Sequence, residues 1–186
     1  MRKLLLLCAA LLVLCNIAQA QSCALPWLAA RLSAVESTGY NRGPLVDKII
    51  VAGGGNPYVR KSPEWCGFTQ AAANRACGCP IPRNGTQGRA AAWFPLTGPD
   101  AHRTVFFRGR RGSIDSIRAG QKAGFDYGAG IHHVNAVAEL GRPVRAGRAP
   151  RSVWCVGGNE GTGATAGVKR NLWPVTSIDG LSDWSK

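Results

Sequence analysis

The stretch from Ser62 to Gly78 constrains the fold and the chemistry of this chain more than any other part of the sequence. Ser62 is a preferred helix N-cap, and the proline after it suits a first helical turn because its missing N–H would have no partner there. An alanine-rich run follows, and Gly78 and Pro80 are typical of a helix end. The pattern predicts a short helix with Cys66 near its positive N-terminus. That position favours the thiolate, which is the nucleophilic form of cysteine.

The first twenty residues have the three parts of a secretory signal peptide. Arg2 and Lys3 form a positive region, residues 4–14 are apolar, and residues 18–20 match a small-residue cleavage site. The apolar run is short for a membrane span, and no later stretch approaches that length. We predict a signal peptide over residues 1–20, a single mature domain over residues 21–186, and no stable membrane insertion after cleavage. The mature protein is expected to be exported, either periplasmic or secreted, and monomeric.

The mature chain is strongly basic. The whole sequence has a formal net charge of +13, and two of those charges leave with Arg2 and Lys3. Such a charge attracts a polyanion, which can be nucleic acid, an anionic membrane surface or an anionic cell wall. Export disfavours nucleic acid, so we expect no nucleic-acid partner.

An odd number of cysteines remains after signal cleavage: Cys23, Cys66, Cys77, Cys79 and Cys155. In an oxidising compartment this number indicates two disulfides and one thiol. The sequence does not fix the pairing, and our interpretation keeps Cys66 as the thiol and bridges the other four. A zinc site at Cys77-Gly78-Cys79 is the alternative. Its one-residue gap is shorter than the usual ligand spacing, so we expect no metal and no cofactor.

Helical patterns come before strand patterns along the chain. Apolar residues recur at helical spacing over residues 25–37 and 45–50, and glycines at 53–55 end the second of these segments. A further helical turn is expected at residues 90–94. Helices first and strands afterwards predict an α+β domain with the helices on one side of an antiparallel sheet.

Four later segments have strand character: residues 104–107, 131–140, 152–156 and 168–175. Residues 157–159, Gly-Gly-Asn, are expected to break the third of them, and Pro174 suits an edge strand. Residues 108–130 are basic and glycine-rich, and we interpret them as a long surface insertion. A long loop of this kind inside a compact domain is more often functional or mobile than filler.

Catalysis by a cysteine needs an imidazole to take the thiol proton and a polar group to fix that imidazole. Within the strand at 131–140, His133 shares a face with Asn135 because side chains alternate. Asn159 follows the next strand, after two glycines that allow a close backbone approach. It can then bond one ring nitrogen of His133 while the other faces Cys66. Each of these residues alone also fits an ordinary structural role in packing, on the surface or in a turn.

The order of these residues resembles a known family. Residues 63–68, Pro-Glu-Trp-Cys-Gly-Phe, resemble the Pro-Trp-Cys-Ala-Phe signature of papain-like cell-wall amidohydrolases, the NlpC-type and CHAP peptidases. Three further segments resemble the first core strand, the Gly-His-Val-Gly strand and the Gly-Gly-Asn turn of that family, namely residues 104–108, 132–137 and 156–159. The lead-in with Trp27, Glu36, Gly39 and Asn41, and the closing residues 169–174, are similar to one bacterial subgroup.

The resemblance implies a papain-like fold in which N-terminal helices pack on a small antiparallel sheet. It implies Cys66 as nucleophile, His133 as base and Asn159 as third catalytic residue, acting on peptidoglycan. Substrate binding is assigned to three residues near these motifs or in the basic loops: Trp65, Arg110 and Arg111.

The chain departs from the family pattern at several places. His132 replaces the glycine before the histidine, which makes His132 the alternative base, and Asn135 replaces a small residue. Glu64 stands between the proline and Trp65 of the signature. Two hypotheses follow: a cysteine peptidase or amidase, and a non-catalytic cationic cell-wall-binding protein on the same scaffold.

Overall fold

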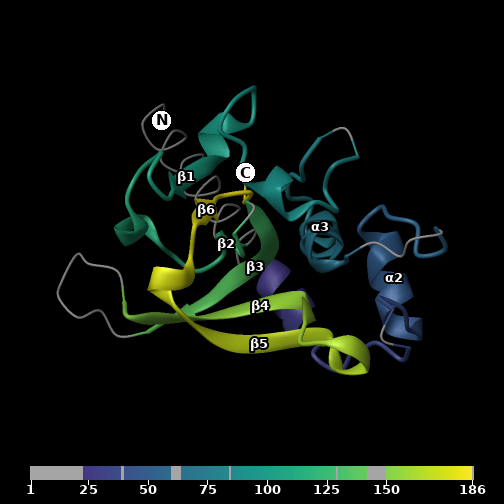
Figure 1. The fold of residues 1–186 in the computed structure, drawn as a ribbon. Helices are drawn as coiled ribbons and strands as arrows, with labels where there is room; N and C mark the ends of the chain where they lie inside the picture. The colour runs from purple at the N-terminus through teal and green to yellow at the C-terminus, as the bar shows by residue number, and fades with distance from the viewer. Residues whose placement is uncertain are drawn as a thin grey trace, which may run out of the picture.

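Figure 1 shows the computed structural model, in which residues 23–38, 40–59, 64–83, 85–128, 130–141 and 150–185 are described. The predicted signal peptide, the helix start expected at Ser62 and most of the basic turn at residues 142–151 lie outside these ranges. Within them, no helix combines the length and the apolarity needed to cross a bilayer.

The described strands form a six-stranded antiparallel sheet in the order β1-β6-β2-β3-β4-β5. Their bounds are β1 Thr104–Phe107, β2 Lys122–Asp126, β3 Ile131–Leu140, β4 Ser152–Glu160, β5 Gly167–Pro174 and β6 Gly180–Ser182. The strands expected near residues 104, 131, 152 and 168 are therefore confirmed, and β5 is an edge strand that ends at Pro174. The break expected at residues 157–159 is wrong, because β4 continues to Glu160.

The segment at residues 108–130 is not a surface insertion. It contains β2, which lies inside the sheet between β3 and β6. Ala123 and Phe125 alternate into the core, and the charged Lys122 is also buried. A Cβ at Gly124 would lie 2.7 Å from the Phe94 ring, so this glycine is needed for close packing. Lys122 and Gly124 do not fit a strand pattern in the sequence, because the reason for each residue is a contact with a side chain from a distant part of the chain.

The helices lie on one side of the sheet (Figure 1). Residues 23–29 are helical, a shorter helix than the one expected over residues 25–37, because Val35 already forms a bridge to Gly167. α2 spans Pro44–Ala52, and a 3-10 turn spans Ala90–Trp93. Both confirm their predictions. The chain is thus an α+β protein with helices packed against an antiparallel sheet.

α3 spans Cys66–Ala76 and is the most deeply buried helix of the group. Its alanines, Ala72 and Ala73, pack with α2 residues and with Ala136 and Val156 of the sheet. Ala136 belongs to the face predicted from the alternation of β3, and Val137 points into a second core on the opposite side. The sheet therefore has one face under the helices and one under the loops that precede β2 and β6.

One disulfide, between Cys23 and Cys77, ties the N-terminal helical segment to the end of α3. Cys66 remains a thiol, as predicted, but so do Cys79 and Cys155, so the expected second bridge is wrong. Cys155 lies in the loop-covered core of the sheet, whereas Cys79 lines a small space beside Ala24 and Lys122. No group of three or more metal-ligating side chains gathers in the described part of the chain.

Candidate active site

Cys66 is the first residue of α3, and the residue before it fixes its position. Trp65 is the N-cap of the helix and is fully buried, with 0% of its surface exposed. Its Nε1 donates a hydrogen bond of 2.9 Å to the buried carboxylate of Glu36, which also accepts from the backbone N–H of Asn41 at 2.9 Å. The prediction that Trp65 binds substrate is therefore wrong. Trp65 anchors the start of α3, and Glu36 is the residue that holds it.

Two glycines bring the sheet and a neighbouring loop close to the start of α3. A Cβ at Gly158 of β4 would lie 2.1 Å from Thr69 Oγ1 and 2.6 Å from the Trp65 ring. A Cβ at Gly67 would lie 2.4 Å from the carbonyl oxygen of Gly88. Real Cβ atoms do not come this close, so only glycine permits the approach at both positions. The close approach predicted for the glycines before Asn159 is confirmed.

β3 carries the imidazole that meets Cys66. His133 is 7% exposed, and its Nε2 lies 2.7 Å from Oε1 of Glu160 on β4. The Cys66 sulfur lies 3.9 Å from the backbone carbonyl oxygen of His132, the residue before His133, and the Cys66 side chain is near enough to help raise the pKa of His133. Because Nε2 is occupied by Glu160, the ring nitrogen left for Cys66 is Nδ1. Cys66 and His133 therefore lie near each other, and their pairing as nucleophile and base stays a prediction.

The residue that fixes the imidazole is Glu160, which the sequence analysis did not single out. Asn135 donates a hydrogen bond of 2.6 Å to Oε1 of Glu160, and Asn171 of β5 donates one of 2.7 Å to Oε2. With His133, three donors from two neighbouring strands converge on this one buried carboxylate. Asn135, which replaces a small residue of the family pattern, thus helps to hold Glu160 in place.

The assignment of Asn159 as the partner of His133 is corrected to Glu160. The pairing of β4 with β5 shifts register between Gly157 and Glu160, and Asn159 has φ of 63° at this irregularity. Asparagine tolerates this left-handed conformation better than most residues, which gives Asn159 a backbone role. Reading β4 as continuous to residue 160 would have pointed to the carboxylate one position later.

Burial and charge act in opposite directions on this group of side chains. Burial by itself lowers the pKa of His133, but its interactions with Cys66 and Glu160 raise that pKa to about 10. Burial raises the pKa of Glu160, and the hydrogen bond and charge of His133 then bring it below its ordinary value. At neutral pH the arrangement is therefore an imidazolium held between a carboxylate and a sulfur. Such a cation favours the thiolate and carries a proton that can be given to a leaving group.

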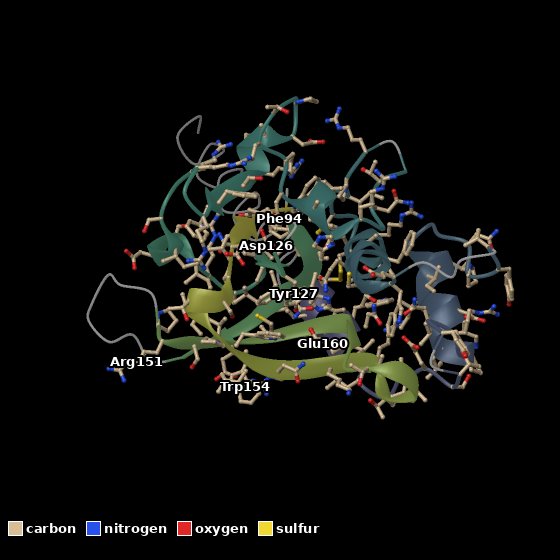
Figure 2. All side chains as sticks on the ribbon, viewed as in Figure 1. Phe94, Asp126, Tyr127, Arg151, Trp154 and Glu160 are labelled. Carbon is tan, nitrogen blue, oxygen red and sulfur yellow. A yellow bond between two sulfur atoms is a disulfide. The ribbon has the colours of Figure 1, made fainter. Side chains whose placement is uncertain are left out.

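Tyr127 is a further residue near this centre that the sequence analysis missed. It follows β2, and Figure 2 labels it together with Glu160 and Asp126. Burial raises the pKa of its phenol, and negative charge on Glu160 and Cys66 raises it further. Asp126 shapes the turn after it, since its carboxylate accepts backbone N–H bonds from Gly128 and Gly130.

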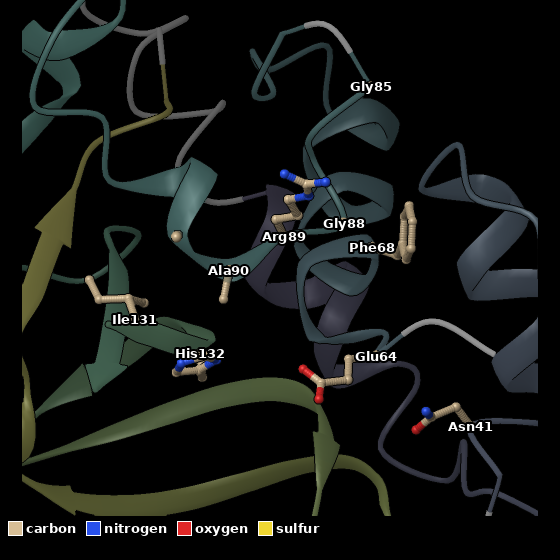
Figure 3. Close-up of a pocket in the computed structure, with 10 residues that line it drawn as sticks. Asn41, Glu64, Phe68, Gly85, Gly88, Arg89, Ala90, Ile131 and His132 are labelled. Carbon is tan, nitrogen blue, oxygen red and sulfur yellow. The ribbon is translucent and has the colours of Figure 1, made fainter. Parts of the chain in front are cut away.

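A cavity of about 630 Å³ lies between the start of α3, the loop that leads to the 3-10 turn at Ala90 and the start of β3 (Figure 3). Its apolar wall includes Ala90 and Ile131, which also pack with Cys66. The exposed side chain of His132 lines the cavity, and the imidazole joined to Glu160 is that of His133. The register of β3 therefore favours His133 over His132 as the base.

Arg110 and Arg111 lie in an exposed turn after β1. The Arg110 guanidinium sits over the Phe107 ring, 5.7 Å from its centroid, and Arg111 donates to the carbonyl of Ala101. No contact between described residues joins either arginine to Cys66, His133 or Glu160, so the structure does not bring them into the site. Other arginines of the same basic stretch are used in ion pairs, for example Arg118 with Asp183 at 2.7 Å.

Comparisons of this chain with protein-family models, with curated proteins and with solved structures gave no match. The function is therefore argued from the site itself.

Proposed function

We propose that this chain is an exported cysteine hydrolase with a papain-like fold that cleaves an amide bond in peptidoglycan, either as an endopeptidase or as an N-acetylmuramoyl-L-alanine amidase. The observation that carries the proposal is the buried hydrogen bond between His133 and Glu160, with Cys66 close enough to help raise the pKa of His133. Together these residues provide a thiol at a helix start, an imidazole and a buried carboxylate, which is the set of groups that nucleophilic catalysis by cysteine requires.

In the proposed reaction, the Cys66 sulfur attacks the carbonyl carbon of the amide. The carbon–nitrogen bond breaks as His133 gives its proton to the leaving nitrogen, and a thioester to Cys66 remains. A water molecule then attacks the thioester while His133 takes one of its protons. The carbon–sulfur bond breaks, the acid product leaves, and the sulfur and the imidazolium are restored.

The start of α3 supplies stabilisation for the oxyanion that forms during both attacks. The first backbone N–H groups of a helix have no acceptor inside it, and the first bond of this helix runs from Thr69 N to the carbonyl of Trp65 at 2.9 Å. The N–H of Cys66 precedes that bond and lies on the residue that carries the nucleophile. Fixed donors of this kind commonly contribute about 10²–10³ in rate.

Export is supported by the disulfide between Cys23 and Cys77, because disulfides persist mainly in oxidising compartments. The basic charge of the chain favours an anionic substrate. Peptidoglycan itself is proposed on the resemblance of the residues around Cys66 and His133 to cell-wall amidohydrolases.

The proposal is tested by incubating purified peptidoglycan with the mature protein and with Cys66→Ala. The variant is expected to lose activity by about 10³-fold or more, since the members of a catalytic unit act together. Cys79→Ala is the matched control because it removes a thiol outside the site and should stay active. Mass spectrometry of the released fragments identifies the bond cleaved. A Cys66→Ala protein that solubilises peptidoglycan at the wild-type rate would end the enzyme proposal.

One observation favours a second candidate, a non-catalytic cationic cell-wall-binding protein. Only 1% of Cys66 is exposed, which suits a packed thiol as well as a nucleophile covered until substrate binds. In that case binding to peptidoglycan falls steeply with added salt and no fragments appear. Iodoacetamide would then modify the partly exposed Cys79 and leave Cys66 unmodified, whereas the enzyme is expected to be modified at Cys66 and inactivated.

A further inference from the structure

The cavity shown in Figure 3 carries charges of both signs on different parts of the chain. Glu64 lies two residues before Cys66, and Arg89 lies just before the 3-10 turn at Ala90. Figure 3 shows the Glu64 carboxylate turned into the cavity, with the Arg89 side chain on another part of its wall. Neither side chain forms an ion pair or a hydrogen bond with any described residue.

Several other acids and arginines of the surface pair with each other. Arg42 pairs with Asp47, Arg83 with Asp100 and Arg118 with Asp183. The charges of these residues are therefore balanced within the protein and are not left for a ligand. Glu64 and Arg89 line one cavity and yet do not meet each other. An acid and a base held apart on the wall of a cavity can each bind a group of a ligand placed between them.

The rest of the cavity wall limits the ligand further. Its apolar part consists of small and medium side chains, with Ala90, Ala91 and Ile131 on one side and Phe68 on another. Ala90 and Ile131 of this wall also pack with the buried Cys66. A ligand bound here therefore has its small apolar parts against this wall.

We propose that this cavity is a recognition site for a short peptide that carries both a free ammonium group and a free carboxylate, with Glu64 binding the ammonium group and Arg89 the carboxylate. Applied to the choice of substrate, this inference rests on the proposed function. The enzyme then prefers peptide stems whose amino group is free over stems in which a crosslink has converted that amino group to an uncharged amide.

The inference is tested by binding, so that no turnover is needed. The probe is dialanine in four forms: free at both ends, N-acetylated, C-amidated, and blocked at both ends. Each form is titrated into the Cys66→Ala protein, which cannot hydrolyse it, and dissociation constants are measured from NMR shifts. Acetylation and amidation are each expected to weaken binding by about threefold to tenfold, the range for a partly exposed charge-assisted contact.

Two further variants assign the contacts. In Cys66→Ala with Glu64→Gln, acetylation of the peptide should no longer matter, while amidation should still weaken binding. Arg89→Gln should give the reverse pattern. Arg110→Gln is the control because this exposed arginine lies outside the cavity, and it should leave both preferences unchanged. The comparison of the four peptides uses one protein, Cys66→Ala, and changes only the ligand. It therefore remains valid even if the Glu64 or Arg89 variant fails to fold.

Equal affinity for all four peptides, or preferences that persist in both variants, would overturn the inference. If such a result accompanies hydrolysis of peptidoglycan by the wild-type protein, the proposed function stands without it. If the charge preferences are found and peptidoglycan is not hydrolysed, the binding site stands and the proposed hydrolase does not.

Discussion

Replacing Glu160 by glutamine tests the placement of the carboxylate behind His133. The substitution keeps the size and shape of the side chain and removes its charge. In the wild-type protein one carboxylate oxygen accepts from both His133 and Asn135, and the other accepts from Asn171. A glutamine has a single acceptor oxygen, so its amide nitrogen must face at least one of these donors.

The magnitude follows from those contacts. A buried donor left without an acceptor costs about 1–3 kcal/mol, and breaking a buried ion pair by removing one partner costs about 3–5 kcal/mol. The second cost is not added in full, because His133 can release its proton when Glu160 is gone. We expect the free energy of unfolding to fall by about 3 kcal/mol at pH 7. The rate of hydrolysis should fall by about 10³–10⁴, the usual loss when the residue that orients a catalytic histidine is removed.

The pH dependence of stability gives an independent readout. The pKa of His133 is raised from its ordinary value of 6.5 to about 10 in the folded protein, so between these pH values the folded state holds a proton that the unfolded state releases. This contribution is fully present below pH 6.5 and is lost as the pH rises toward 10. The pKa of Glu160 is lowered, so its own contribution is lost on acidification. Denaturant titrations from about pH 3 to 10 should show both slopes reduced in Glu160→Gln, the Glu160 slope below pH 4.5 and the His133 slope above pH 6.5.

Asn159→Gly is the matched control for this experiment. The variant removes the side chain first proposed as the partner of His133, and glycine accepts the positive φ of this position without strain. We expect activity within a few-fold of wild type and unchanged pH slopes. A Glu160→Gln protein with wild-type activity, beside an inactive Asn159→Gly, would refute the assignment of the carboxylate and return the third role to Asn159.

Three further predictions concern the scaffold. Burial lowers the pKa of Lys122 to about 8, so the charged form of this side chain destabilises the folded protein below that pH. In denaturant titrations, the free energy of unfolding of Lys122→Met should exceed that of wild type by about 3 kcal/mol below pH 8, and the difference should shrink toward pH 10.5. A difference that does not change with pH would contradict a buried ammonium group. Gly158→Ala should lower the free energy of unfolding by about 1–3 kcal/mol, since its Cβ would meet Thr69 at 2.1 Å, and a neutral effect would show that β4 can move away from α3. Cys23→Ser opens a disulfide that spans 54 residues and should cost about 2–4 kcal/mol by the same assay, whereas reducing agent should add nothing to the loss in this variant.

Local patterns were sufficient for the elements whose side chains repeat with a clear period. α2 and β3 were predicted because their apolar residues recur at helical and alternating spacing, and β5 because its proline fits an edge. β2 was missed because its lysine and glycine are explained only by partners elsewhere. Lys122 is buried because its ammonium group donates to Gln70 of α3 at 3.1 Å, and no local pattern reports that contact.

The start of α3 shows the same limit. A serine and a proline predicted a helix that begins at Ser62, whereas the described helix begins at Cys66 with Trp65 as its N-cap. The position of Trp65 depends on the carboxylate of Glu36, which is 29 residues away in the sequence. Capping propensity is weak in comparison with such a buried contact, so tertiary packing decided where the helix begins.

By itself the sequence determined the available chemistry: a thiol close to a helix start, two adjacent histidines in a strand, and a glycine pair that permits close packing. The tertiary structure alone decided that His133 lies near Cys66, that Glu160 holds His133, and that Glu64 and Arg89 share a cavity. The reason is physical. Local spacing fixes which face of an element a side chain occupies, whereas the partner of that side chain depends on strand register, on a single irregularity near Asn159 and on contacts between residues far apart in the chain.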